Sequence, residues 1–326
     1  MPAASPAPSA PHRKALIGCK ANFWLHSSST GFDLTHPSPP TTPSPGPRLT
    51  LQTTTTPVTI APHKSALVVI DMQNFFLSPA LGRSPSSPGQ AACRQLIEHA
   101  IPAARRAGVR VVWVNWGVTD EEVRCMPAGV KRAFGFYAIA HDAEHEVESV
   151  VAGGVVEGSV GVDKHGEERD AGIYSGIGSQ MGSVGLGAGD EVDAGRLLMR
   201  GSWNADLYPP LRELYDQGAQ LRDRPDVWIH KNRMSGLWGA TTPLQRFLEE
   251  QGIQTLLFAG VNTDQCVGGT LTDAFSNGYD CILLSDGCGT SSPGFAQECW
   301  EYNAANTFGF CASCEDLARG VEGMEK

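Results

Sequence analysis

Five short apolar runs divide the chain beyond residue 65 into alternating strands and helices. Each run is rich in Val, Ile and Leu without polar alternation, as is typical of strands buried on both faces of a parallel sheet. The segments between them have helical spacing of apolar residues, and several end at a glycine. Strands are predicted at residues 65–70, 109–116, 227–230, 255–259 and 281–285, and helices at 93–107, 207–218, 242–252 and 264–277.

This alternation predicts one α/β domain over residues 61–326. Strand–helix–strand units form right-handed parallel crossovers, and helices then cover both faces of the sheet. We therefore expect a three-layer α/β/α architecture with a doubly wound, mainly parallel, Rossmann-like sheet.

Two segments depart from the pattern. Residues 1–60 are rich in Pro, Ser and Thr, which is typical of an extended or disordered N-terminal arm, although the apolar stretch at 15–26 favours contact with the domain or a neighbouring subunit. Residues 141–195 are Gly-rich, charged and aperiodic. We interpret them as an insertion of loops or a small hairpin, which is either a lid or a solvated decoration.

Composition restricts the partners and the location. The 326 residues include 25 basic and 35 acidic ones, a net charge of −10, which argues against nucleic acid or an anionic membrane as partner. No apolar run reaches the roughly 20 residues of a transmembrane helix, and the N-terminus lacks the apolar core of a secretory signal. Nine scattered cysteines indicate reduced thiols in a cytoplasmic protein. Seven tryptophans favour a homo-oligomer.

Three side chains with complementary chemistry stand at or just beyond the ends of predicted strands. They are Asp71, Lys231 and Cys266. Because ligand sites in doubly wound sheets lie at the carboxyl ends of the strands, we expect these three to meet. Alone, each is more typical of a capping acid, a solvated lysine or a buried thiol. Together they form a candidate nucleophilic set.

Each member of this set has an expected role. Cys266 begins a predicted helix, whose free N–H groups and positive dipole end favour thiolate over thiol. We expect the thiolate to attack a carbonyl carbon, Asp71 to carry the proton from the thiol to the leaving amine, and Lys231 to hold Asp71 and stabilise charge. The backbone N–H groups of Gln265 and Cys266 are the expected oxyanion donors.

Three motifs resemble the isochorismatase-like cysteine hydrolases, a family that includes nicotinamidases, N-carbamoylsarcosine amidohydrolase and ureidoacrylate amidohydrolase. The motifs are DMQNFF at 71–76, RMSG shortly after Lys231, and GVNTDQCVGGTLTDAFSNGY at 260–279. The resemblance covers about 65–116 and 227–293, under half of the chain.

The resemblance implies a six-stranded parallel sheet and an Asp–Lys–Cys triad at Asp71, Lys231 and Cys266. It also implies a non-proline cis peptide between Val261 and Asn262. Nicotinamidases carry an Asp-x-His metal motif after the second strand, where this sequence has Asn-Trp-Gly at 115–117. We therefore expect no metal, no other cofactor and no nicotinamidase activity.

Residues beside the motifs are candidates for contact with the substrate, although each is equally consistent with packing. Their amides and aromatic rings suit a neutral polar substrate with a flat body. The candidates are Gln73, Asn74, Phe76, Asn115, Trp116 and Trp238. Arg233 is a candidate for reading a substrate carboxylate, with a surface ion pair as the alternative.

The sequence favours hydrolysis of a C–N bond in a small amide or ureide through a thioester, because some isochorismatases that cleave a vinyl ether lack the nucleophilic cysteine. An ether hydrolase that uses Asp71 alone is the first alternative. The second is a catalytically idle family member that acts as a scaffold or binding protein, with an unreactive Cys266.

Overall fold

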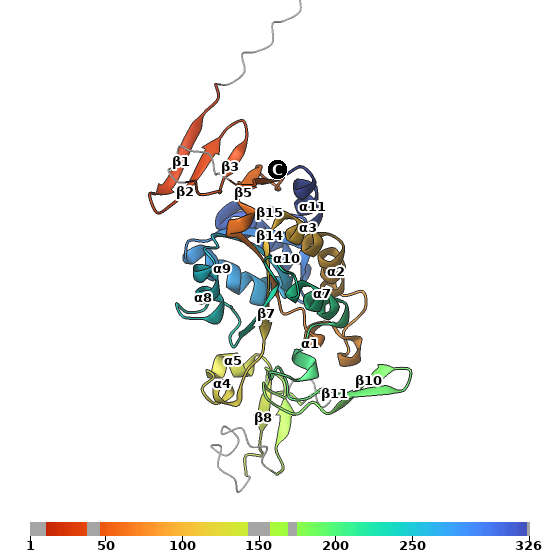
Figure 1. The fold of residues 1–326 in the computed structure, drawn as a ribbon. Helices are drawn as coiled ribbons and strands as arrows, with labels where there is room; N and C mark the ends of the chain where they lie inside the picture. The colour runs from red at the N-terminus through yellow and green to blue at the C-terminus, as the bar shows by residue number, and fades with distance from the viewer. Residues whose placement is uncertain (1–10, 38–45, 143–156, 169–174, 325–326) are drawn as a thin grey trace, which may run out of the picture.

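The core of the molecule is a six-stranded parallel sheet in the order β12-β7-β6-β13-β14-β15 (Figure 1). This computed structural model describes residues 11–37, 46–142, 157–168 and 175–324. The strands are β6 (Ser65–Ile70), β7 (Arg110–Trp116), β12 (Val227–Lys231), β13 (Thr255–Val261), β14 (Asp280–Gly289) and β15 (Phe310–Ala312). The expected doubly wound α/β fold and its six-stranded sheet are confirmed.

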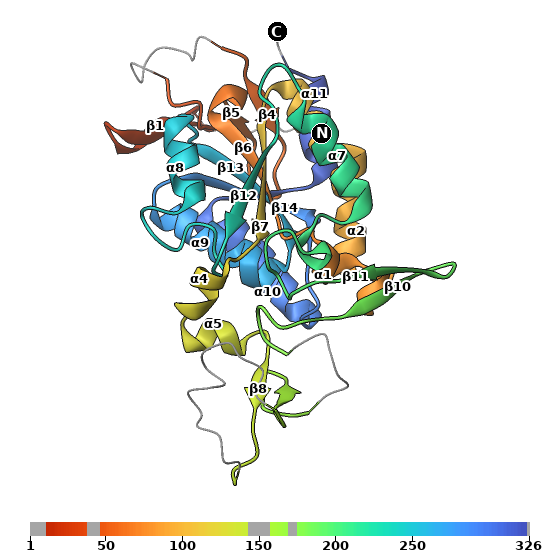
Figure 2. The same cartoon turned by 60° about the horizontal axis from the view of Figure 1, so that its bottom comes forward.

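Helices cover both faces of the sheet, so the domain has three layers (Figures 1 and 2). One face packs against α2 (Pro88–Gln95), α3 (Ile101–Ala107), α7 (Pro209–Ala219) and α11 (Cys314–Glu322). The other packs against α8 (Pro243–Glu250) and α9 (Gly268–Ser276). Alternate strand residues face the two layers: Trp113 lies in the first core and Trp116 in the second. The remaining helices are α1 (Asn74–Leu77), α4 (Asp120–Arg124), α5 (Ala128–Arg132) and α10 (Gly294–Asn303).

The switch in winding direction falls between β6 and β13, the two strands at the centre of the sheet. Chain order runs outward from β6 through β7 to β12 on one side, and from β13 through β14 to β15 on the other. Ligands bind in such sheets beside the carboxyl ends of the strands at this point. Gly260 permits the close pairing there, because a Cβ at this position would lie 2.0 Å from the Ile70 carbonyl oxygen.

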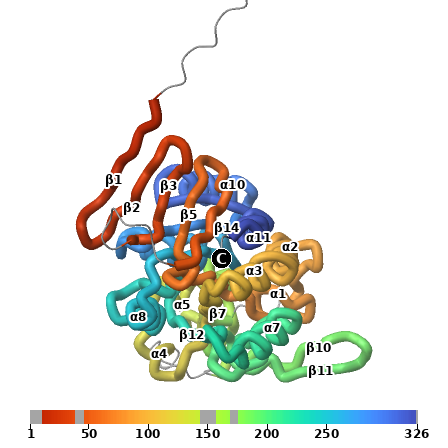
Figure 3. Tube along the Cα trace, turned by 45° about the horizontal axis from the view of Figure 1, so that its top comes forward, coloured from red at the N-terminus to blue at the C-terminus, as the bar shows by residue number. Residues whose placement is uncertain are grey.

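A second sheet stands where the sequence suggested an extended or disordered arm. Its five strands have the order β1-β2-β3-β5-β4, and Figures 1 and 3 show the sheet near α11 at one end of the domain. They are β1 (Lys14–Cys19), β2 (Asn22–Ser27), β3 (Gly31–Asp33), β4 (Leu49–Leu51) and β5 (Val58–Ile60). Apolar and polar residues alternate in β4 and β5, and the apolar ones, Leu49, Leu51, Val58 and Ile60, enter the hydrophobic core. Strand β4 packs against α11. Residues 1–10 and 38–45 of the expected arm lie outside the described residues.

A buried carboxylate joins this N-terminal sheet to the core. Asp280 is 1% exposed, and its oxygens lie 2.6 Å from Trp24 Nε1, 2.8 Å from His36 Nε2 and 2.7 Å from Thr255 Oγ1. Trp24 and His36 come from the N-terminal segment, whereas Thr255 begins β13. A buried acid with three polar partners therefore fixes the position of the N-terminal sheet.

Replacing Asp280 by alanine is expected to lower the free energy of unfolding by about 3–5 kcal/mol, because it leaves several buried polar groups without a partner. Urea unfolding followed by circular dichroism measures the change. Asp273→Ala on α9 is the matched control and is expected to stay within about 0.5 kcal/mol of the parent. Equal midpoints for the two variants would show that the contact does not anchor the sheet.

The Gly-rich insertion and the residues just before it form short antiparallel pairs at the carboxyl end of the parallel strands, opposite the N-terminal sheet (Figures 1 and 2). Strand β8 (Phe136–Ala138) pairs with β9 (Val160–Val162), and β10 (Ser183–Gly187) pairs with β11 (Asp190–Asp193). Residues 143–156 and 169–174 of the expected insertion lie outside the described residues.

No helix among the described residues has both the length and the apolar character needed to cross a bilayer. All nine cysteines fall within the described ranges, and each is a free thiol. In the same ranges, no cluster of three or more His, Cys, Asp or Glu side chains has the arrangement of a metal site.

Candidate active site

Asp71, Lys231 and Cys266 meet at the carboxyl end of the sheet. Asp71 follows β6, Lys231 is the last residue of β12, and Cys266 lies in a π-helical turn (Thr263–Val267) between β13 and α9. Lys231 Nζ lies 2.9 Å from Asp71 Oδ2 and 3.4 Å from Cys266 Sγ. The structure therefore brings together the acid, the ammonium and the thiol that the strand ends predict.

Asp71 is held in an uncommon backbone conformation. Its φ of 54° lies in the left-handed region, which aspartate tolerates better than most residues. Its N–H donates to the Val114 carbonyl at 3.0 Å, and its Oδ1 accepts the Trp116 N–H at 3.0 Å. These bonds to β7 leave Oδ2 directed at Lys231, so the carboxylate has one fixed orientation.

Lys231 is the centre of the group. Besides its contacts with Asp71 and Cys266, its Nζ donates to the backbone carbonyls of Arg233 and Met234 at 3.1 Å each. The same nitrogen lies 4.0 Å from the centroid of the Trp116 ring, a cation–π contact. These acceptors and the ring give the Lys231 nitrogen favourable contacts although the residue is only 4% exposed.

Burial sets the protonation of the thiol and of the acid. Cys266 is 4% exposed and Asp71 is fully buried. Burial raises the pKa of Cys266 to about 12, although nearby Lys231 lowers it in part. Burial likewise raises the pKa of Asp71, against the opposing effect of Lys231. The sequence-based expectation of a lowered thiol pKa is therefore wrong, because burial outweighs the favourable charges around Cys266.

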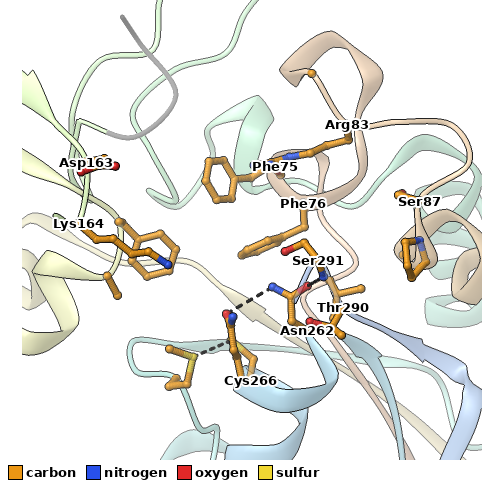
Figure 4. Close-up of a pocket in the computed structure, with 18 of the residues that line it drawn as sticks. Phe75, Phe76, Arg83, Ser87, Asp163, Lys164, Asn262, Cys266, Thr290 and Ser291 are labelled. Atoms are coloured by element: carbon orange, nitrogen blue, oxygen red, sulfur yellow. Dashed lines mark hydrogen bonds between the residues drawn. The ribbon is translucent and has the colours of Figure 1, made fainter. Parts of the chain in front are cut away.

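A cavity of about 560 Å³ opens above Cys266 (Figure 4). Its wall combines aromatic rings, hydroxyl groups, amides and charged side chains. The lining residues are Phe75, Phe76, Gly82, Arg83, Ser84, Ser87, Pro88, Gly89, Ala133, Phe134, Gly161, Val162, Asp163, Lys164, Ser175, Met234, Val261, Asn262, Gln265, Cys266, Thr290 and Ser291. A volume of this size admits a small organic molecule.

The turn before Cys266 supplies backbone groups to the cavity wall. The peptide between Val261 and Asn262 is cis, and both residues line the cavity. The Gln265 N–H donates to the Asn262 carbonyl at 3.0 Å, so this expected oxyanion donor is already occupied. For the N–H groups of Asn262 and Cys266, no backbone acceptor outside the turn is recorded among the described residues.

Most of the residues that we expected to contact the substrate do not line the cavity. Phe76 lines the cavity. Gln73 is buried, and its side-chain amide donates to the backbone carbonyls of Trp116 and Ala205 at 2.7 and 2.6 Å. It therefore links two backbone segments and does not face the cavity. Asn74 is also buried and donates to the Trp203 carbonyl at 2.9 Å.

The other three candidates also lie outside the cavity lining. Asn115 is fully buried. It directly precedes Trp116 in β7, and successive side chains of a strand point to opposite faces, so Asn115 lies on the face of the sheet opposite Trp116. Trp116 is fully buried beneath Lys231. Trp238 is 52% exposed, and the Arg233 guanidinium lies 4.9 Å from the centroid of its ring, a cation–π contact. Neither residue lines the cavity.

Sequence reasoning missed several lining residues. Phe75 adjoins the DMQN motif, and that proximity is the signal by which it could have been found. Arg83 and Ser87 come from the segment between α1 and α2, whereas Phe134 and Lys164 come from the segments flanking β8 and β9. Nothing in their local sequence marks them, because folding of distant loops over the sheet edge creates the cavity.

Alkylation of Cys266 is expected to speed up with pH throughout the range 7–10, by about tenfold per unit, because only the thiolate reacts and the pKa is about 12. Iodoacetamide labelling, quantified by peptide mass spectrometry, measures the rate, with exposed Cys299 as internal reference. A plateau above pH 7 would instead show a resting thiolate and contradict the effect of burial.

Known proteins and one family model are similar to this chain. The sequence model of the isochorismatase domain family matches residues 188–316, which include Lys231 and Cys266. Ureidoacrylate amidohydrolase RutB of Klebsiella variicola (strain At-22) is 28% identical over 267 residues, which cover 81% of this chain and 89% of the relative. The protein of that name from Enterobacter sp. (strain 638) is 27% identical, with coverage of 81% and 92%. The crystal structure of nicotinamidase PncA from Bacillus subtilis has a TM-score of 0.48 at 19% identity, over 77% of this chain and 99% of that chain.

The family match spans the later strands of the sheet, and the curated relatives extend the similarity across most of the chain. The observed sheet has the strand order expected for this kind of fold. The chain is therefore similar to the isochorismatase domain family over residues 188–316 and to ureidoacrylate amidohydrolases over most of its length, in agreement with the resemblance found in its sequence.

Proposed function

We propose that this chain is a cysteine-dependent amidohydrolase that cleaves a C–N bond of a small amide or ureide through a thioester at Cys266. The observation that carries the proposal is the position of Lys231 Nζ, within 2.9 Å of Asp71 Oδ2 and 3.4 Å of Cys266 Sγ, beneath a cavity lined by Cys266. The names of the similar curated proteins, ureidoacrylate amidohydrolases, support a C–N bond in a ureide as the target.

The first half-reaction transfers the acyl group to sulfur. Asp71 removes the thiol proton, and Cys266 Sγ forms a bond to the substrate carbonyl carbon. The raised pKa of Asp71 suits this transfer, because it makes the carboxylate a stronger base. The Lys231 ammonium stabilises the thiolate while it forms. The C–N bond then breaks, and Asp71 gives its proton to the leaving nitrogen.

The second half-reaction returns the free thiol. Water attacks the thioester carbon while Asp71 accepts one of its protons, and the C–S bond breaks as sulfur regains a proton. The carbonyl oxygen carries negative charge in both steps. The Asn262 and Cys266 N–H groups at the cavity wall are the donors best placed to stabilise it, in place of the occupied Gln265 N–H.

The two alternatives from the sequence make different demands on the thiol. An ether hydrolase that depends on Asp71 keeps its activity after alkylation of Cys266, whereas an amidohydrolase loses it. An idle scaffold hydrolyses neither class of compound. The contact between Cys266 and Lys231 favours the amidohydrolase, because an ether hydrolase needs no nucleophile at that position.

An ammonia-release screen over amides, ureides and carbamoyl compounds tests the proposal, with Cys266→Ala as the blank. We expect Cys266-dependent release from at least one ureide or amide. Release that is equal in the parent and in Cys266→Ala would reject a cysteine mechanism. Vinyl-ether cleavage by both proteins would establish the ether hydrolase instead.

Assembly and location complete the proposal. We expect a homo-oligomer in the cytoplasm, on the evidence of the tryptophan content and the free cysteines. Sedimentation at micromolar concentration measures the oligomeric state, and a monomer at that concentration would contradict the expected homo-oligomer.

A further inference from the structure

The Lys231 ammonium has more acceptors around it than it has hydrogens. Its Nζ lies 2.9 Å from Asp71 Oδ2, 3.1 Å from each of the backbone carbonyls of Arg233 and Met234, and 3.4 Å from Cys266 Sγ. An ammonium carries three N–H donors, so at most three of these four contacts are full hydrogen bonds at one time. The sulfur is the most distant acceptor, and it is therefore short of a donor when it becomes an anion.

The other recorded side-chain contacts of the sulfur do not fill this gap. Cys266 Sγ lies 3.3 Å from Met234 Sδ, and a thioether accepts hydrogen bonds but cannot donate them. An ionised Asp71 likewise has no donor. A Cys266 thiolate in this position therefore needs a donor from some other side chain or from the backbone.

Trp116 carries a donor that has no acceptor. The residue is fully buried, and its Nε1 makes no hydrogen bond to any described residue. A buried donor without a partner costs free energy and is uncommon in proteins. Its ring lies beside the reacting group, because its centroid is 4.0 Å from Lys231 Nζ, the nitrogen that also contacts Cys266. One group is thus short of a donor, and its neighbour has a donor to spare.

The Trp116 ring is held in place from two sides. Its backbone N–H donates to Asp71 Oδ1 at 3.0 Å and to Gln73 Oε1 at 3.1 Å, and its carbonyl accepts the Gln73 amide at 2.7 Å. Phe134 packs edge-on against the ring at a centroid distance of 5.2 Å. Although burial raises the pKa of Cys266, the Lys231 charge and a hydrogen-bonding contact from the Trp116 side chain lower this pKa in part. The fixed indole is therefore close enough to act on the sulfur.

We propose that the Trp116 indole N–H donates a hydrogen bond to the Cys266 thiolate, a bond that is completed only when the sulfur is charged. This role rests on the proposed function for its meaning in catalysis, and it adds a thiolate donor to the triad. Trp116 then acts beneath Lys231 instead of contacting the substrate, as its sequence position suggested. The indole keeps its hydrogen throughout. The thiol proton goes to Asp71 during turnover and to water when no substrate is present.

Alkylation of Cys266 without any substrate tests this role in Trp116→Phe, which keeps an aromatic ring beneath Lys231 and removes the N–H. Loss of a hydrogen bond to a charged group raises the pKa by about one to two units, and the greater nucleophilicity of the less stabilised thiolate offsets about half of the effect on rate. Alkylation at pH 8 is therefore expected to slow about three- to tenfold, by the same factor for iodoacetamide and for the larger N-ethylmaleimide.

Trp113→Phe is the matched control. It is the same substitution on the same strand, but Trp113 lies in the opposite core, where its Nε1 donates to Asp226 at 2.9 Å. Its alkylation rate is expected to stay within about twofold of the parent. A protein with 3-benzothienylalanine at position 116 covers any change in packing or folding caused by the smaller ring. This side chain replaces the N–H by sulfur in a ring of the same shape, and the same slowing is expected.

An unchanged rate in the benzothienylalanine protein, different factors for the two reagents in that protein, or equal slowing in Trp113→Phe would overturn the role of Trp116. Different factors would mean altered access to the sulfur instead of altered ionisation. The proposed function fails separately, because alkylation needs no turnover. Slowing at position 116 in a protein that shows no Cys266-dependent hydrolysis leaves the hydrogen bond in place and rejects the amidohydrolase.

Discussion

Replacing Cys266 by alanine is expected to lower turnover by roughly 10⁴-fold or more while leaving the fold intact. The side chain lost is the proposed nucleophile, and removal of a nucleophile typically eliminates most of the rate enhancement. The stability cost is expected to be about 1 kcal/mol, because only one sulfur atom leaves the wall of an open cavity. Steady-state ammonia release and urea unfolding measure the two quantities.

Cys281→Ala is the matched control. Cys281 is a buried thiol in the same hydrophobic core but lies outside the cavity lining. Its replacement is expected to lower stability while leaving turnover per folded molecule near that of the parent. Comparable losses of turnover in the two variants would mean that Cys266 acts only through packing.

Replacing Lys231 by methionine is expected to have the second largest effect. The buried Asp71 carboxylate then loses its counter-ion at 2.9 Å, and the free energy of unfolding at neutral pH is expected to fall by about 3–5 kcal/mol. Turnover is expected to fall by at least about 10²-fold, because the forming thiolate also loses a positive charge. Urea unfolding and ammonia release again provide the measurements.

The double variant Asp71→Asn/Lys231→Met separates stability from catalysis. Neutralising both partners removes the unpaired charge, so the free energy of unfolding is expected to recover most of the loss seen in Lys231→Met, while activity stays absent. Additive destabilisation by the two substitutions would show that the pair is not coupled. Recovered activity would show that Asp71 is not the base.

The grouping of the acid, the lysine and the thiol could be predicted from the sequence because it depends on regular structure. Asp71, Lys231 and Cys266 stand at the ends of apolar runs, and parallel strands direct their carboxyl ends to one edge of a sheet. Their meeting therefore follows from strand prediction alone. The pKa of Cys266 cannot be predicted from the strands, because it depends on how deeply the packed loops bury the sulfur.

The cavity above Cys266 could not be predicted in the same way. Asn115 and Trp116 are neighbours in sequence, yet a strand directs them to opposite faces, and the apolar run does not say which face meets the nucleophile. Lys164 lies far in sequence from every motif and reaches the cavity through the pairing of β8 with β9. The position of the N-terminal sheet depends on the long-range contacts of Asp280 with Trp24 and His36. The composition of residues 1–60 gives no sign of these contacts.

Intact-protein mass spectrometry after acid quenching, with a substrate identified in the ammonia-release screen, tests the central claim most directly. A covalent acyl adduct is expected on the parent protein during turnover, located on Cys266 by peptide mapping and absent from Cys266→Ala. Active turnover without any adduct on Cys266, accompanied by retained activity in Cys266→Ala, would contradict a thioester mechanism at this site.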